Sequence, residues 1–272
     1  MFISSNGIMY HVEVVGEGEP IVFLHGFTGD LTTWYQITRM LRNRYKCVLI
    51  DLIGHGKTDS PEGFLRYNLE TVSQDIMQIL DVLHITKTHL VGYSMGGRLA
   101  LATAVLFPTR IASLILESSS PGLRTEKERA ERRNSDELLA SQIEKDGVER
   151  FVDYWENIPL FASQKTLTRE QQQEIRKQRL GNNPVGLANS LRGMGTGAQL
   201  SYWERLHEIH VPTLLICGEL DQKFCTIAKE MSTRIQTAKV EKVEDTGHAI
   251  HVEQPQFFGK IVDEFVSDHI SS

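Results

Sequence analysis

Ser94 lies between Gly92 and Gly96, in a pattern typical of a reactive serine. A short apolar run, residues 89–91, precedes it, and a helix-like segment, residues 95–107, follows. A strand that turns sharply into a helix exposes the middle side chain at the sheet edge, and small flanking residues avoid clashes there. Backbone N–H groups at the start of a helix also favour developing negative charge. The pattern therefore predicts that Ser94 performs chemistry.

A reactive serine needs a base, and the base needs a carboxylate that fixes its tautomer. Of the ten histidines, His248 best fits a loop that follows the last short strand, residues 239–243. Asp221 lies just beyond the apolar run 213–217 and is the preferred acid; Glu117, and more distantly Glu219, are the alternatives. The chain order serine, aspartate, histidine supports a catalytic triad of Ser94, Asp221 and His248.

The residues after the first buried run, 21–24, are His25, Gly26 and Phe27. A loop at this place supplies a donor to the oxyanion hole, so we assign the hole to the backbone N–H groups of Phe27 and Met95. We interpret His25, and His55 likewise, as a hydrogen-bonded structural residue.

No phosphate-binding or metal-binding motif emerges. Gly56-Lys57-Thr58 resembles the end of a phosphate-binding loop, but Asp51 stands where that loop requires a glycine. No cluster of histidine, cysteine and carboxylate residues has a metal-ligand spacing. We expect neither a metal nor an organic cofactor.

The elements that must position these residues alternate along the chain. Asn6-Gly7 predicts a hairpin turn between two extended segments, and short apolar runs then alternate with helix-like stretches such as residues 69–83 and 257–269. This alternation indicates an α/β sheet covered on both faces. It stops at residues 121–203, which are charged, glutamine-rich and amphipathic. We interpret 121–203 as a helical lid inserted after the sixth strand, with 1–120 and 204–272 as the core; the alternative is a solvated helical appendage.

Composition excludes several partners. A net charge of −6 argues against nucleic acid, which needs a basic face. Cys47, Cys217 and Cys225 form no disulfide set, and a reducing compartment is the simpler interpretation. Residues 1–20 do not resemble a signal peptide, and no apolar run is long enough to span a bilayer. We therefore expect a cytoplasmic protein that works without a membrane, as a monomer or a small homo-oligomer.

Over nearly its full length the chain resembles the α/β-hydrolase superfamily, which implies a mostly parallel, eight-stranded sheet. Within it, the chain is similar to the 2-succinyl-6-hydroxy-2,4-cyclohexadiene-1-carboxylate synthases of menaquinone biosynthesis, which are lyases that eliminate pyruvate from an enolpyruvyl cyclohexene. The superfamily landmarks are residues 25–27, 51–56, 92–97, 218–221 and 247–248. The narrower likeness rests on Gly96-Gly97-Arg98 and on residues 120–123, 128–132, 159–163, 179–183 and 217–224.

This resemblance implies a small anionic polycarboxylate as substrate. By the same resemblance, Arg98, Arg132 and Arg179 engage its carboxylates, and Tyr93 lines the pocket beside the serine. Guanidinium groups bind carboxylates in a bidentate way, which agrees with such a substrate. The alternative is that Arg132 and Arg179 belong to solvated, ion-paired helix faces, as charged runs usually do.

The resemblance also changes the expected role of the serine. In the lyase, Ser94 and His248 remove a proton and form no acyl-enzyme. Two other functions stay open: an ester or C–C bond hydrolase with Ser94 as nucleophile, and a non-catalytic ligand receptor on the same fold.

Overall fold

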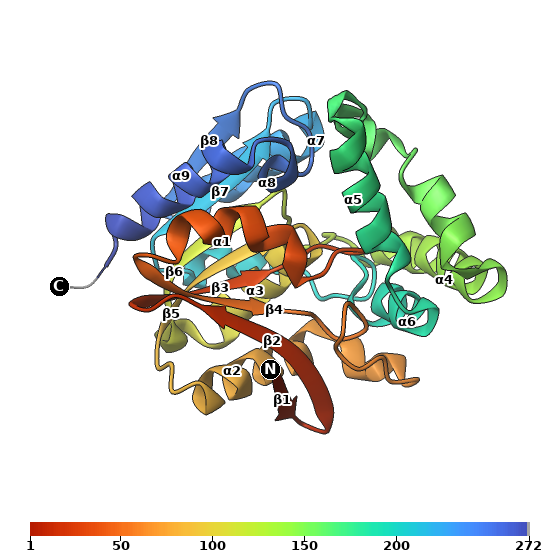
Figure 1. Ribbon diagram of the computed structural model, residues 1–272, viewed down its shortest axis with the longest axis horizontal. Helices are drawn as coiled ribbons and strands as arrows, with labels where there is room; N and C mark the ends of the chain where they lie inside the picture. The colour runs from red at the N-terminus through yellow and green to blue at the C-terminus, as the bar shows by residue number, and fades with distance from the viewer. Residues whose placement is uncertain (271–272) are drawn as a thin grey trace.

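The computed structural model describes residues 1–270 and contains an eight-stranded sheet in the order β1-β2-β4-β3-β5-β6-β7-β8 (Figure 1). β1 pairs with β2, and β2 with β4, in antiparallel fashion, whereas all other neighbours are parallel. This mostly parallel sheet confirms the predicted fold class. The strands are β1 (Phe2–Ser5), β2 (Ile8–Val15), β3 (Glu19–Leu24), β4 (Tyr45–Ile50), β5 (Thr88–Tyr93), β6 (Ile111–Glu117), β7 (Thr213–Gly218) and β8 (Ala238–Val243).

The hairpin at the N-terminus forms where Asn6-Gly7 predicted it. Both residues have positive φ, 46° and 80°, which a two-residue turn between twisted strands requires. The turn sets the register of the hairpin, with Ser5 opposite Ile8.

Helices cover both faces of the sheet and form two apolar layers. Along β3, Val22 and Leu24 pack into the layer beneath α2 and α3, while Ile21 and Phe23 pack into the layer beneath α1 and α9. This division follows from the alternation of side chains along a strand. The core helices are α1 (Tyr35–Leu41), α2 (Leu69–Val82), α3 (Met95–Leu106), α7 (Gln222–Ser232), α8 (Ile250–Glu253) and α9 (Pro255–Ser267), with short 3-10 helices η1 (Leu31–Trp34), η2 (Phe64–Tyr67), η3 (Pro108–Arg110) and η5 (Trp203–Glu208).

A helical insertion, residues 121–203, separates β6 from β7 and projects beyond the sheet (Figure 1). Its two ends meet, because the N–H of Tyr202 donates to the carbonyl of Pro121 over 2.8 Å. An apolar cluster joins α4 to α6, and Phe27 of the core packs against it. The insertion contains α4 (Glu126–Trp155), η4 (Pro159–Thr166), α5 (Arg169–Leu180) and α6 (Pro184–Met194). Within residues 1–270, no helix has the length and apolar character needed to cross a bilayer.

Candidate active site

Ser94 occupies the turn between β5 and α3. Its φ of 50° and ψ of −105° are unusual for a residue with a side chain, and its N–H donates to the carbonyl of Glu117 over 2.9 Å. A side chain at position 96 would overlap the carbonyl oxygen of Leu24, so only glycine lets α3 approach the end of β3 so closely. The turn therefore holds a strained serine at the carboxyl edge of the sheet.

The structure brings together the three residues predicted as the triad. His248 Nε2 lies 3.0 Å from Ser94 Oγ, and His248 Nδ1 lies 2.7 Å from Asp221 Oδ2. Asp221 also caps α7, where its Oδ1 accepts from the N–H of Phe224 over 3.3 Å. His248 is 2% exposed, so little water competes for these contacts. The arrangement can draw the proton from Ser94.

Neither alternative acid contacts His248. The fully buried Glu117 instead binds His251, with 2.8 Å between Glu117 Oε2 and His251 Nδ1. Glu219 pairs with Lys242 at the surface, and their charged atoms are 2.8 Å apart. Asp221 is therefore the carboxylate that orients the base.

The two backbone groups predicted for the oxyanion hole follow β3 and begin α3. Among residues 1–270, the N–H groups of Phe27 and Met95 have no hydrogen-bond acceptor, so both remain available to a ligand. His25 has a structural place, because its Nε2 accepts from the N–H of Leu52 over 2.9 Å. Burial lowers the pKa of His25, which keeps it neutral.

Arg98 and Arg179 are buried cations that contact no carboxylate directly, although the charge of Asp136 acts on Arg98 and that of Glu156 on Arg179. They are 9% and 6% exposed, and within the described part of the chain neither forms an ion pair. Arg98 donates to the Met194 carbonyl over 2.7 Å and to Gln199 Oε1 over 2.5 Å, while Arg179 donates to Gln164 Oε1 over 3.0 Å. Burial, aided by the charge of Arg132, lowers the pKa of Arg98 to about 10, and burial also lowers the pKa of Arg179. Both side chains stay charged at neutral pH.

Arg132 differs from these two. It is partly exposed and forms an i,i+4 ion pair with Asp136, with 2.8 Å between Nε and Oδ1. The alternative that these arginines belong to solvated, ion-paired helix faces therefore holds in part for Arg132. It does not hold for the buried Arg179. Arg132 nevertheless lies close enough to Arg98 for its charge to affect the pKa of Arg98. Arg132 therefore lies within electrostatic reach of Arg98, with Asp136 as its own ion-pair partner.

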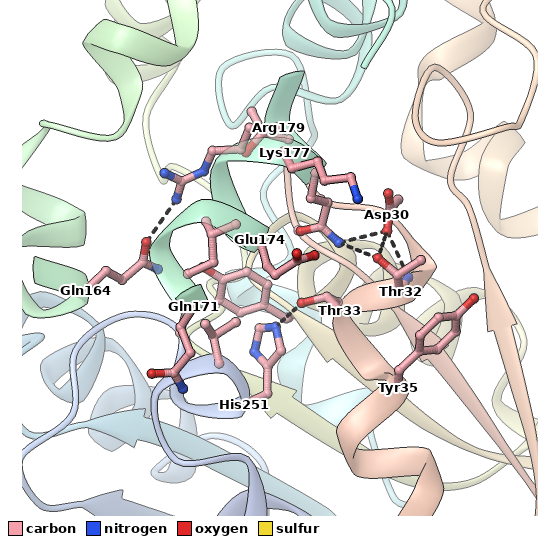
Figure 2. A pocket seen from close by; sticks show the side chains of 18 of the residues that line it. Asp30, Thr32, Thr33, Tyr35, Gln164, Gln171, Glu174, Lys177, Arg179 and His251 are labelled. Atoms are coloured by element: carbon pink, nitrogen blue, oxygen red, sulfur yellow. Dashed lines mark hydrogen bonds between the residues drawn. The ribbon is translucent and has the colours of Figure 1, made fainter. Parts of the chain in front are cut away.

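A cavity of about 680 Å³ opens between α5 and the segment that follows β3 (Figure 2). Arg179 and Gln164 line it from the insertion, and His251, Phe27 and Tyr93 line it from the core. Its size suits a small organic ligand. Ser94 and His248 are not among its lining residues, so the cavity adjoins the triad and does not enclose it.

Tyr93 forms part of the wall between the cavity and the triad. Its ring lies between the imidazoles of His248 and His251, at centroid distances of 5.4 and 4.6 Å. Burial, followed by the charge of Glu117, raises the pKa of Tyr93 well above its ordinary value, so the hydroxyl stays protonated.

Trp155, which sequence reasoning did not identify, packs against two residues that line the cavity, Phe27 and Phe161. Its ring packs edge-on against Phe27 at 5.5 Å and lies 5.9 Å from Phe161. Its indole N–H is buried without an acceptor in residues 1–270, although such groups are usually hydrogen-bonded. A single tryptophan near the end of a charged helix does not indicate a functional site, because its contacts depend on how the insertion folds over Phe27.

Comparison with known proteins agrees with this fold and site. The sequence pattern of the α/β hydrolase fold family matches residues 19–255. The chain therefore belongs to the α/β hydrolase family.

Closer relatives narrow the class. A Bacillus subtilis (strain 168) protein, provisionally assigned as a 2-succinyl-6-hydroxy-2,4-cyclohexadiene-1-carboxylate synthase, is 49% identical over 265 residues, 97% of this chain and 96% of its own. A Salmonella agona (strain SL483) protein named as the same synthase is 34% identical over 240 residues, 88% of this chain and 90% of its own. The structure of MenH from S. aureus superposes with a TM-score of 0.92 at 39% identity, covering 96% of this chain and 99% of that one. The chain also belongs to this family of synthases.

Proposed function

We propose that this chain eliminates pyruvate from 2-succinyl-5-enolpyruvyl-6-hydroxy-3-cyclohexene-1-carboxylate, giving 2-succinyl-6-hydroxy-2,4-cyclohexadiene-1-carboxylate in menaquinone biosynthesis. The relatives that are similar over almost the whole chain carry the name of this synthase. The fold alone would not select this reaction, because one fold hosts many chemistries.

The observation that carries the proposal is the pair of buried, unpaired guanidinium groups, Arg98 and Arg179. A buried charge without a direct ion pair costs on the order of several kcal/mol, and an anionic ligand would offset this cost. The proposed substrate carries three carboxylates and can neutralise both arginines and Arg132. An uncharged ester would leave these cations unpaired.

In this mechanism Ser94 and His248 act as the base. Ser94 Oγ takes the proton from the ring carbon that bears the succinyl ketone, and His248 Nε2 takes the proton of Ser94. The N–H groups of Phe27 and Met95 stabilise the resulting enolate oxygen. The electron pair returns through the ring double bond and breaks the C–O bond, and the departing enolate of pyruvate is then protonated. No acyl-serine forms.

The remaining site residues orient the substrate. The arginines hold the carboxylates, Tyr93 supports the pocket wall, and the indole N–H of Trp155 supplies a further donor. Residues 121–203 serve as the lid over a core formed by 1–120 and 204–272. We place the enzyme in the cytoplasm, as a monomer or small homo-oligomer that acts on a soluble polycarboxylate.

The test is a coupled assay of pyruvate release from the enolpyruvyl substrate. Ser94→Ala removes the base and should lower kcat by at least about a thousandfold, since residues of such a triad act as a unit. Ser232→Ala changes a partly exposed serine at the end of α7, whose hydroxyl donates only to the Lys229 carbonyl, and should leave the rate unchanged. Intact turnover in Ser94→Ala would refute the triad assignment, and a covalent acyl-Ser94 trapped from this substrate would refute proton abstraction.

A further inference from the structure

The loop that carries His248 is held by a carboxylate outside the triad. Glu253, on α8, accepts the N–H of Gly247 at Oε2 over 2.7 Å and the N–H of Ala249 at Oε1 over 3.4 Å. These two residues directly precede and follow His248 in the chain. Glu253 therefore fixes the backbone on both sides of the base.

The helical insertion reaches the same carboxylate. On η4, Ser163 Oγ donates to Glu253 Oε1 over 3.0 Å. Ser163 packs so closely on the loop that a side-chain carbon at Gly247 would overlap its hydroxyl. Glu253 thus receives one hydrogen bond from the insertion and two from the His248 loop.

Two neighbours of Ser163 on η4 also touch the site. Phe161 meets the His248 ring edge-on at a centroid distance of 6.3 Å, and the Arg179 guanidinium lies 4.6 Å above the Phe161 ring. Gln164 accepts a hydrogen bond from Arg179 over 3.0 Å (Figure 2). A single short segment therefore contacts both an arginine proposed to bind substrate and the base.

We infer that Glu253 is a positioning residue for His248, and that the Ser163–Glu253 hydrogen bond ties the placement of this base to the helical insertion. The inference rests on the proposed function only in assuming that His248 serves Ser94. A base is effective only within hydrogen-bond reach of its proton, and small displacements of a catalytic group are costly. Through this hydrogen bond, the position of η4 sets the placement of the imidazole.

The experiment measures Ser94 reactivity independently of the natural substrate. A fluorophosphonate probe labels a serine activated by its histidine, and pyruvate release is followed in parallel. Glu253→Gln retains the size of the side chain but removes the charge and one acceptor, whereas Ser163→Ala removes only the contact from the insertion. The matched controls are Glu264→Gln on the exposed face of α9 and Ser232→Ala.

In Glu253→Gln, the maximal labelling rate and kcat should fall together, by about 10- to 100-fold, while KM and the probe affinity stay within about twofold. Ser163→Ala should lower both rates by about 3- to 10-fold. Thermal melting of each variant separates this effect from loss of folding, and Ser163→Ala provides the test if Glu253→Gln does not fold.

Labelling of Glu253→Gln at the rate of Glu264→Gln would overturn the positioning role. Unchanged labelling of Ser163→Ala would overturn the tie to the insertion. A wild type that labels normally but releases no pyruvate would refute the proposed function and leave the labelling comparison valid.

Discussion

At the residue scale, the environments of the arginines separate substrate-binding candidates from surface ion pairs. Arg192, for example, binds both Glu137 and Glu144 near the surface, and such pairs contribute little to stability. Arg98 lies on the first turn of α3 beyond Ser94 and meets only neutral oxygens. These hydrogen bonds fix the position of the guanidinium group, and its charge can still bind an anionic ligand.

Replacing Arg98 with lysine tests whether this planar group is needed. Lysine preserves the charge but cannot form two parallel hydrogen bonds with a carboxylate. We expect Arg98→Lys to raise KM for the enolpyruvyl substrate by about tenfold or more, with a smaller change in kcat. Steady-state pyruvate release gives both constants. Arg110→Lys, whose partner Asp81 is at the surface, is the control, and an unchanged KM in Arg98→Lys would remove Arg98 from the substrate site.

Sequence and structure agree best where a short motif fixes the local backbone. Ser94, His248 and Asp221 could be predicted because a strand, a sharp turn and a helix leave few places for them. The burial of Arg179 and the orphaned N–H of Trp155 could not, since both depend on contacts between segments far apart in sequence. The pairing of Glu117 with His251 could not be predicted either. Glu117 and Asp221 both lie at the carboxyl ends of neighbouring strands, so the sequence alone cannot tell which of them orients His248.

At the element scale, α4 determines where Trp155 lies. The helix contains a break at Gly147, with φ 83° and ψ 170°, a conformation that residues with side chains avoid. The amphipathic character of residues 121–203 predicted helices in this stretch, and in the structure α4 continues beyond the break to Trp155. The second part carries Phe151 and Trp155 onto Phe27.

Gly147→Ala should disturb this second part of α4. Strain at such a residue costs about 1–3 kcal/mol, which a straighter helix would relieve by moving Trp155 away from Phe27. We expect a lower Tm, altered tryptophan fluorescence and a higher KM. Gly63→Ala, at an ordinary φ with open space around the added carbon, is the matched control. Wild-type fluorescence and KM in Gly147→Ala would show that the break does not position Trp155.

At the scale of the whole molecule, the alternation of apolar runs and amphipathic stretches correctly predicted the sheet and its covering helices. The ends of the strands were less predictable. β3 begins at Glu19 and β6 ends at Glu117, because pairing with neighbouring strands includes polar residues that hydropathy does not mark. Pairing between strands distant in sequence is the information that a local pattern lacks.

Buried histidines make the stability of the whole fold depend on pH. Burial lowers the pKa of His55 to about 3 and that of His89 to about 4. Between these values and the ordinary pKa of about 6.5, the unfolded chain binds protons that the folded chain does not. The contribution of these histidines to the free energy of unfolding is therefore fully present above about pH 6.5, and it is lost as the pH falls toward about 4.

Urea unfolding at about pH 7.5 and about pH 5 measures this decline. His89→Gln should reduce the difference in the free energy of unfolding between the two pH values, because each unit of lowered pKa corresponds to about 1.4 kcal/mol. His210→Gln replaces an exposed histidine and should preserve the wild-type difference. An equal pH dependence in His89→Gln and wild type would contradict this account.

The hydrogen bond between Pro121 and Tyr202 has a consequence for how such proteins diversify. Because residues 121–203 leave and rejoin the sheet at neighbouring points, a segment of different length or sequence can replace them without rerouting any strand. Ser94, Asp221 and His248 lie outside that interval, whereas Arg132, Trp155 and Arg179 lie inside it. Exchange at this single junction would replace the part of the substrate site that the insertion supplies, and would leave Arg98 and the proton-transfer apparatus in place.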